Sequence, residues 1–166
     1  MTLRLSSMLL LATLALAACS NPDRFGGGGD GAGFGAGGPG SASDPSSPAY
    51  FQTSVGDRVF FAVDESSISD QASAILTAQG QWLNTNSNFS VIVEGHADER
   101  GTREYNLALG ARRANAVREY LISQGVAGNR IRTVSYGKER PVAVCSDESC
   151  YSQNRRAVTV IAGGQS

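Results

Sequence analysis

The segment GHADERGTREYNLALGARRANAV, residues 95–117, constrains the fold of this chain more than any other part of it. An acidic loop leads directly into a helix, and helical spacing places Leu109, Arg113 and Val117 on one stripe, with Asn106 at its upper end. Arg113 therefore interrupts an apolar face. Because a buried guanidinium without a partner is costly, we expect Arg113 to have a carboxylate partner, either within the protein or supplied by a ligand.

The rest of the pattern predicts alternating strands and helices in a single domain at residues 50–166. Strands are expected at residues 58–63, 89–94, 131–135 and 157–161, and helices from Ser67 or Ser69 to about Thr85 and from Thr102 to just before Gly125. This order, β-α-β-α-β-β, predicts a two-layer α/β (α+β) sandwich, with two main helices on one face of a mixed four-stranded sheet.

The first 18 residues are typical of an export signal. Arg4 carries the only side-chain charge, and the apolar run at residues 8–16 is shorter than the roughly 20 residues that span a bilayer. Two cleavage sites stay open. An ordinary signal peptidase would act at ALA, residues 15–17, whereas LAAC, residues 16–19, resembles a lipobox that is cut just before Cys19. Either site leaves a mature chain for which we expect no transmembrane segment.

The three cysteines favour the lipoprotein interpretation. Cys145 and Cys150 can close a small disulfide loop in an oxidising compartment, which leaves Cys19 over. Acylation of Cys19 explains the odd cysteine and would hold the protein on a membrane, while a free exposed thiol is the alternative. A zinc site would need more ligands than two thiols and His96 provide, so we expect no metal and no cofactor.

Residues 19–49 are expected to form a lipidated N-terminus and a flexible linker. The segment is rich in Gly, Ser, Pro and Ala, a composition that cannot bury enough apolar surface to fold. The whole chain has 14 basic and 15 acidic side chains, a formal net charge of −1. This balance argues against binding to nucleic acid, which favours strongly basic domains.

The central motif also carries a family resemblance. Its residues are Gly95, His96, Asp98, Gly101, Asn106, Leu109, Arg112, Arg113, Ala114 and Val117, followed by SYGKERP at 135–141 and NRR at 154–156. Over residues 59–161 the chain resembles the OmpA-like peptidoglycan-binding domain. The strings EGHADERGT and VSYGKE are most similar to the lipoprotein branch of that family, the peptidoglycan-associated lipoproteins of the Tol-Pal system.

The resemblance implies a ligand and the residues that bind it. Members of this family bind the meso-diaminopimelate of peptidoglycan, whose side chain ends in an ammonium and a carboxylate on one carbon. Asp98 would accept the ammonium, and Arg113 would bind the carboxylate through two parallel hydrogen bonds. Backbone N–H groups near Thr102 would add donors, Asn106 would position the loop or touch the ligand, and Phe61 would line the pocket.

Other roles for these residues stay open. Asp98 and Arg113 could form an internal salt bridge that pins the loop to the helix, and Phe61 could be plain core. His96 is expected to order the loop as a hydrogen-bond partner, and Arg155 is a further candidate for the pocket rim. We expect Asp98→Ala or Arg113→Ala to leave the domain folded and to remove binding to peptidoglycan sacculi.

The resemblance also implies a location and partners. Ser20 follows Cys19, which in related lipoproteins implies transport to the outer membrane, with the domain facing the periplasm. Such a protein would tether the outer membrane to the cell wall, serve envelope integrity and cell division, and bind the periplasmic protein TolB. A cell-wall hydrolase that uses Glu94 and Asp98, or a lipoprotein that binds only protein, are the alternatives. Glycosidase chemistry needs a groove and separated carboxyl pKa values, which the motif does not indicate, so we expect no enzyme activity.

Overall fold

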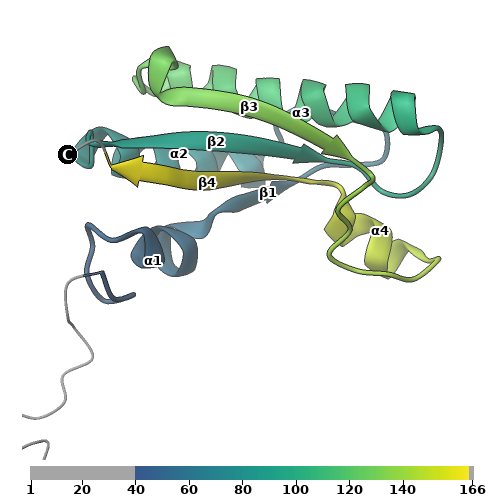
Figure 1. The fold of residues 1–166 in the computed structure, drawn as a ribbon, viewed down its shortest axis with the longest axis horizontal. Helices are drawn as coiled ribbons and strands as arrows, with labels where there is room; N and C mark the ends of the chain where they lie inside the picture. The colour runs from purple at the N-terminus through teal and green to yellow at the C-terminus, as the bar shows by residue number, and fades with distance from the viewer. Residues whose placement is uncertain (1–39, 165–166) are drawn as a thin grey trace, which may run out of the picture. The chain divides into compact units, whose positions relative to one another are not determined.

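A four-stranded sheet organises the described part of this protein, residues 40–164 of a computed structural model (Figure 1). The strands are β1 (Arg58–Phe60), β2 (Phe89–His96), β3 (Ile131–Gly137) and β4 (Arg156–Gly164), and their order across the sheet is β1-β4-β2-β3. β2 and β3 are parallel, whereas β4 is antiparallel to both of its neighbours. The predicted mixed sheet is therefore confirmed.

Both main helices lie on one face of the sheet, behind the strands in the view of Figure 1. α2 (Asp70–Thr85) begins after Ser69, and α3 (Arg103–Ser123) begins after Thr102. Each of these two hydroxyl groups accepts a hydrogen bond from a backbone N–H of the first turn, which satisfies a donor that the helix itself leaves free. The predicted two-layer sandwich is confirmed, and Ser69 rather than Ser67 caps the first main helix.

The hydrophobic core lies between the helices and the sheet. Val91 and Val93 of β2 are 1% and 0% exposed and belong to one core cluster with Leu76 of α2 and Val117 of α3. Ser90, Ile92 and Glu94, which alternate with these valines, are partly exposed, so this part of β2 has the period of two that a sheet covered on one face requires. This packing fixes α3 against the two parallel strands, which end beside the candidate site.

Four short helical segments were not expected from the sequence. They are α1 (Pro48–Tyr50), the π-helix η1 (Phe51–Gly56), the 3₁₀-helix η2 (Gly128–Arg130) and α4 (Glu148–Asn154). None is long enough to show a helical period in its apolar residues. α4 matters most for function, because it lies at the end of the sheet where β2 and β3 terminate (Figure 1).

The folded part begins before residue 50, where the sequence placed the domain boundary. The carbonyl oxygen of Pro45 accepts a hydrogen bond from the indole N–H of Trp82 at 2.7 Å. Ser47 is 2% exposed, and Phe51 packs on Trp82 with ring centroids 4.9 Å apart. Residues that the sequence assigned to the linker therefore contact the core.

The remaining N-terminal predictions concern a segment outside the described residues. They are the signal peptide, the acylated Cys19 and the linker up to residue 39. Among the described helices, none is long and apolar enough to cross a bilayer.

Candidate functional site

A cavity of about 170 Å³ opens where the loops after β1 and β2 meet α3 and the start of β4. Of the candidate ligand-binding residues, Asp98, Asn106, Arg113 and Arg155 line it. The other lining residues are Val63, Asp64, Arg100, Gly101, Tyr105 and Leu109. The motif thus folds so that Asp98, from a loop, and Arg113, from α3, line the same cavity.

Arg113 is fully buried, and its hydrogen-bond partners are backbone carbonyl groups. Its Nε donates to the carbonyl oxygen of Glu65 at 2.8 Å, its Nη1 to that of His96 at 2.8 Å and its Nη2 to that of Ala62 at 3.1 Å. The guanidinium carbon also lies 5.1 Å from the centroid of the Phe61 ring. Among the described residues no carboxylate is bonded to Arg113, so of the two expected sources of a carboxylate partner only a ligand remains.

Arg113 remains positively charged although its side chain is buried. Burial lowers the pKa of Arg113 to about 10, and the nearby Asp98 carboxylate opposes that shift, so the guanidinium stays protonated at neutral pH. A guanidinium has five N–H groups, and the three carbonyls leave two of them for a ligand. Since Arg113 is 0% exposed, a ligand can reach these groups only if side chains of the cavity shift.

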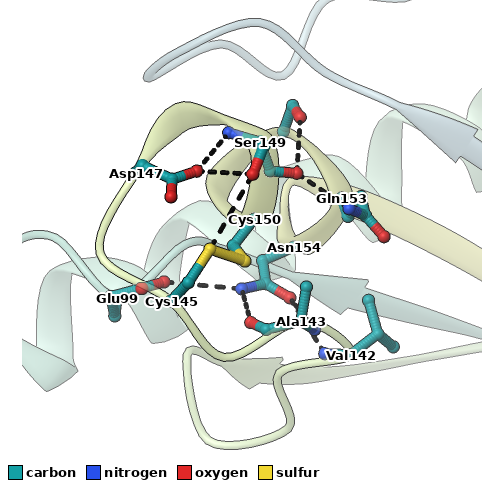
Figure 2. The surroundings of a disulfide bond; sticks show 10 residues. Glu99, Val142, Ala143, Cys145, Asp147, Ser149, Cys150, Gln153 and Asn154 are labelled. Atoms are coloured by element: carbon teal, nitrogen blue, oxygen red, sulfur yellow. Dashed lines mark hydrogen bonds between the residues drawn. A yellow bond between two sulfur atoms is a disulfide. The ribbon is translucent and has the colours of Figure 1, made fainter.

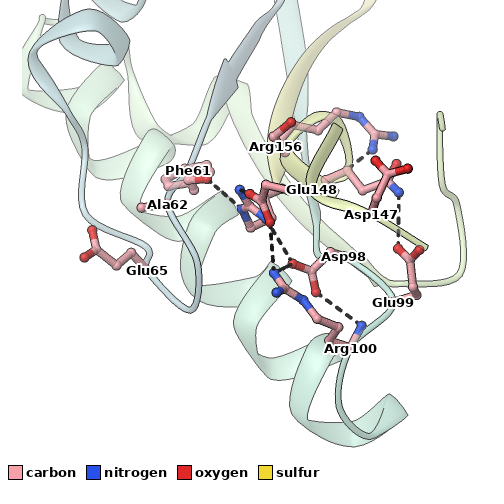
Figure 3. Close-up of polar contacts among 12 residues, drawn as sticks. Phe61, Ala62, Glu65, Asp98, Glu99, Arg100, Asp147, Glu148 and Arg156 are labelled. Carbon is pink, nitrogen blue, oxygen red and sulfur yellow. Dashed lines mark hydrogen bonds and ion pairs between the residues drawn. The ribbon is translucent and has the colours of Figure 1, made fainter. Parts of the chain in front are cut away.

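Asp98 is held by Arg100 (Figure 3) and by Arg155, and not by Arg113. Its Oδ2 accepts from Nη2 of Arg100 at 2.6 Å and from Nη1 of Arg155 at 3.2 Å, and its Oδ1 accepts from the backbone N–H of Arg100 at 3.2 Å. Burial acts to raise the pKa of Asp98, but the hydrogen bonds from Arg100 and Arg155 outweigh it and hold the pKa below 3.8. Asp98 is therefore a carboxylate, and the internal Asp98–Arg113 salt bridge considered from the sequence is not formed.

Asp64 and Tyr105 border the cavity and were missed in the sequence. The Tyr105 hydroxyl donates a hydrogen bond to the Asp64 carboxylate, and this contact raises the pKa of Tyr105 above 10.0. The two residues are 41 positions apart, and no local pattern links them. Their contact joins the loop after β1 to the first turn of α3.

Two predicted site residues do not line the cavity. Phe61 is 6% exposed and belongs to the core cluster beneath Arg113, as the plain-core alternative expected. Thr102 is exposed and caps α3, where its hydroxyl accepts from the N–H of Tyr105 at 3.2 Å. Neither residue is among those that line the cavity, and the predicted donation by backbone N–H groups near Thr102 stays a prediction.

His96 contributes to the site through its backbone. The side chain is 2% exposed, and neither ring nitrogen has a hydrogen-bond partner among the described residues. Its carbonyl oxygen, however, accepts a hydrogen bond from Arg113 at 2.8 Å. The expected ordering role therefore falls to the main chain rather than to the imidazole.

The predicted disulfide between Cys145 and Cys150 is present (Figure 2). With Asp147, the two sulfur atoms form a group whose possible ligand atoms lie within 4.8 Å of one another. Both sulfurs are joined in the disulfide and offer no thiolate to a metal ion. The pair therefore serves to close a loop.

Comparisons with known proteins identify the family to which the chain belongs. The OmpA family model matches residues 60–155. A peptidoglycan-associated lipoprotein of Rhizobium meliloti (strain 1021) is 57% identical over 161 residues, covering 95% of this chain and 87% of that protein. One from Agrobacterium fabrum (strain C58 / ATCC 33970) is 58% identical over 150 residues, covering 90% and 83%.

Solved structures place the fold in the same group. The crystal structure of the peptidoglycan-associated lipoprotein from Burkholderia pseudomallei is similar with a TM-score of 0.65 and 42% identity, covering 73% of this chain and 98% of that one. The C-terminal domain of Helicobacter pylori MotB, at 21% identity and a TM-score of 0.60, covers 64% of this chain and 84% of its own and shares the fold alone. The chain therefore belongs to the OmpA family, within its branch of peptidoglycan-associated lipoproteins.

Proposed function

We propose that this protein is an outer-membrane lipoprotein that binds the diaminopimelate stem peptide of peptidoglycan without forming a covalent bond to it. Acylated at Cys19, it would tether the outer membrane to the cell wall as a component of the Tol-Pal system, with its folded domain in the periplasm. The domain is a binding module and not an enzyme, in keeping with its family.

The observation that carries this proposal is the placement of Asp98 and Arg113 at one cavity without a bond between them. The tip of diaminopimelate carries an ammonium and a carboxylate on one carbon. Asp98 supplies an anion for the first, and the two unused N–H groups of Arg113 supply donors for the second. A ligand with only one of these charges would make only one of the two charge-assisted contacts, which is the basis of selectivity.

Binding to soluble muropeptides tests the site. The full chain, purified in detergent, is titrated by calorimetry with a muropeptide that contains diaminopimelate and with its lysine analogue, which lacks the second carboxylate. We expect tight binding of the first alone, and Asp98→Asn should weaken it by at least about 30-fold because it removes the anion and preserves the side-chain shape.

Glu119→Gln is a matched control, because Glu119 pairs with Arg118 on the outer part of α3 and does not line the cavity. This variant should bind like the unaltered chain. Equal affinity of the unaltered chain for the two muropeptides would contradict recognition of the zwitterion. Undiminished binding by Asp98→Asn would contradict the assignment of the site.

The lipid anchor is tested separately. Cys19→Ser removes the thiol that would be acylated, and acyl chains contribute about 0.8 kcal/mol per buried methylene to membrane binding. We expect the variant to leave the membrane fraction after a carbonate wash, while the unaltered protein stays in the pellet. Retention of the variant in the pellet would refute anchoring through Cys19.

Binding to TolB is the part of the proposal that rests on family membership alone. We expect TolB and peptidoglycan to compete for overlapping surfaces of the domain. Titration of TolB into the protein saturated with muropeptide measures this directly. Simultaneous, saturable binding of both would contradict the competition.

A further inference from the structure

Glu148 completes a network of charges at the edge of the cavity (Figure 3). Its Oε1 accepts a hydrogen bond from Nη2 of Arg155, and its Oε2 lies 3.8 Å from Nη2 of Arg100. These are the same two arginines that hold Asp98. The network thus contains two arginines and two carboxylates, and its charges balance.

The network sets a condition for ligand binding. Oδ2 of Asp98 already accepts hydrogen bonds from Arg100 and Arg155, so a ligand ammonium that binds this oxygen competes with both guanidiniums. The Arg155 side chain is 6% exposed, and a buried guanidinium that loses its carboxylate is costly. The displaced arginine therefore needs a second anion within reach.

We propose that Glu148 is this second anion, and that it thereby sets the selectivity of the site for a zwitterion. The inference rests on the proposed function and assigns a role to a residue outside the cavity lining. When an ammonium binds Asp98, Glu148 still pairs with Arg155 and lies near Arg100. Without Glu148, Asp98 is the only carboxylate among the described residues that pairs with these two arginines, and the site admits a bare carboxylate more readily than a zwitterion.

The disulfide between Cys145 and Cys150 (Figure 2) closes the loop that contains Glu148. Glu148 is the first residue of α4 and lies inside the loop that Cys145 and Cys150 close. Asp147 caps α4 by accepting the backbone N–H of Ser149 at 2.9 Å. The covalent loop limits the conformations open to this first helical turn, so Glu148 is kept beside Arg155.

A buried amide fixes the other end of the same segment. Asn154 is 0% exposed, and its Oδ1 accepts from the backbone N–H groups of Val142 and Ala143 at 2.9 and 3.2 Å (Figure 2). Its Nδ2 donates to the carbonyl oxygen of Ala143 at 2.8 Å. The segment that carries Glu148 is thus held at both ends, and the next residue in the chain is Arg155 itself.

The test compares two ligands that differ by one charge. One muropeptide contains diaminopimelate, and the other contains 2-aminopimelate in its place, which keeps the far carboxylate and lacks the ammonium. Calorimetry on the full chain in detergent gives both dissociation constants. The selectivity ratio is the constant for the 2-aminopimelate ligand divided by the constant for the diaminopimelate ligand. For Glu148→Gln we expect this ratio to fall by about fivefold, through weaker binding of the diaminopimelate ligand.

A double variant that lacks the disulfide tests its role in positioning Glu148, and a variant of the distant carboxylate Glu119 is the control. The double variant Cys145→Ser/Cys150→Ser should also lower the ratio. The triple variant, which adds Glu148→Gln, should have the same ratio as Glu148→Gln alone, because the disulfide acts through Glu148. Glu119→Gln should keep the ratio of the unaltered chain. Thermal unfolding by circular dichroism checks that each variant is folded, and the Glu148 side chain, 60% exposed, can be replaced without opening the core.

The outcomes separate this inference from the proposed function. An unchanged ratio in Glu148→Gln, or an equal loss of affinity for both ligands, would overturn the selectivity role and leave the proposed function standing. A further drop in the triple variant would overturn the coupling through the disulfide. Failure of the unaltered chain to bind either muropeptide would refute the proposed function and this inference with it.

Discussion

Gly95 of β2 and Gly110 of α3 face each other with no room for a side chain between them. A Cβ atom added to Gly95 would lie 1.8 Å from the carbonyl oxygen of Gly110, and one added to Gly110 would lie 2.8 Å from the carbonyl oxygen of Gly95. Helix and strand backbones therefore touch at this point. Arg113 lies one helical turn further along α3, so this contact sets the depth at which its guanidinium meets the carbonyl of His96.

The first prediction concerns this contact. Gly110→Ala should lower the free energy of unfolding by about 1–3 kcal/mol, because the new methyl group meets backbone atoms and the Ser135 hydroxyl at 2.4 Å, and α3 must move outward. It should also weaken muropeptide binding, since Arg113 moves with the helix. Urea unfolding measures the stability. Gly163→Ala is the control, with no atom within 4 Å of the added Cβ, and equal stability of the two variants would contradict the tight contact.

The second prediction revises what the sequence led us to expect for Arg113. Its guanidinium donates to three backbone carbonyls in a buried setting, so Arg113→Met leaves those acceptors without their donors. We expect the free energy of unfolding to fall by roughly 2–4 kcal/mol, measured by urea denaturation, and binding to be lost. Arg113→Ala should likewise destabilise the domain rather than leave it intact.

Arg113→Lys provides the comparison for that experiment. Lysine keeps the positive charge but cannot donate in the planar geometry of a guanidinium, so its stability should fall between those of Arg113→Met and the unaltered chain. Unchanged stability in Arg113→Met would mean that the three carbonyl contacts contribute nothing to folding.

The sequence predicted the elements whose signals are local. Apolar residues at helical spacing predicted α2 and α3, and the hydroxyl residues Ser69 and Thr102 marked their first turns correctly. α4 was missed because its sequence, ESCYSQN, has no apolar period and spans two turns only. The helix that carries Glu148 could therefore not be predicted from the sequence.

The sequence predicted that Asp98 and Arg113 lie near each other, but it did not predict their hydrogen-bond partners. Helical spacing showed that Arg113 points inward, yet its carbonyl partners come from loops 48 and 51 residues away, and no local pattern places a carbonyl oxygen. The Asp98–Arg155 contact spans 57 residues for the same reason. Periodicity gives the face of a helix on which a residue lies, whereas its partners depend on tertiary structure.

The third prediction concerns Asp64, which has a positive φ of 58°. Asparagine and aspartate tolerate this left-handed conformation better than other residues with a side chain. Asp64→Asn should therefore keep the stability of the domain, whereas Asp64→Ala should lower the free energy of unfolding by about 1 kcal/mol, as urea denaturation would measure. The same loss in both variants would point to the carboxylate, which accepts from Tyr105, instead of the backbone.

The fourth prediction concerns the contribution of His96 to the pH dependence of stability, between its pKa in the folded protein and its pKa in the unfolded chain. Burial, together with the positive charges of Arg156 and Arg140, lowers the pKa of His96 from 6.5 to about 4. The nearest carboxylate oxygen, Oε2 of Glu94, lies 3.6 Å from Nε2, and the ring stacks on Tyr136 at 5.6 Å. Between pH 6.5 and about 4 the imidazole is therefore mostly neutral in the folded protein, whereas it would be mostly charged in the unfolded chain.

The direction of the effect follows from proton binding. Between pH 6.5 and about 4 the unfolded chain binds a proton at His96 and the folded chain does not, so stability falls as the pH drops through this window. The shift corresponds to a loss of about 3 kcal/mol once the pH is below both values. His96→Leu removes the titrating group and keeps an apolar side chain beside Tyr136. Urea unfolding at pH 7 and pH 4.5 should show a smaller loss in this variant than in the unaltered chain, and equal losses would assign the acid sensitivity to the carboxylates instead.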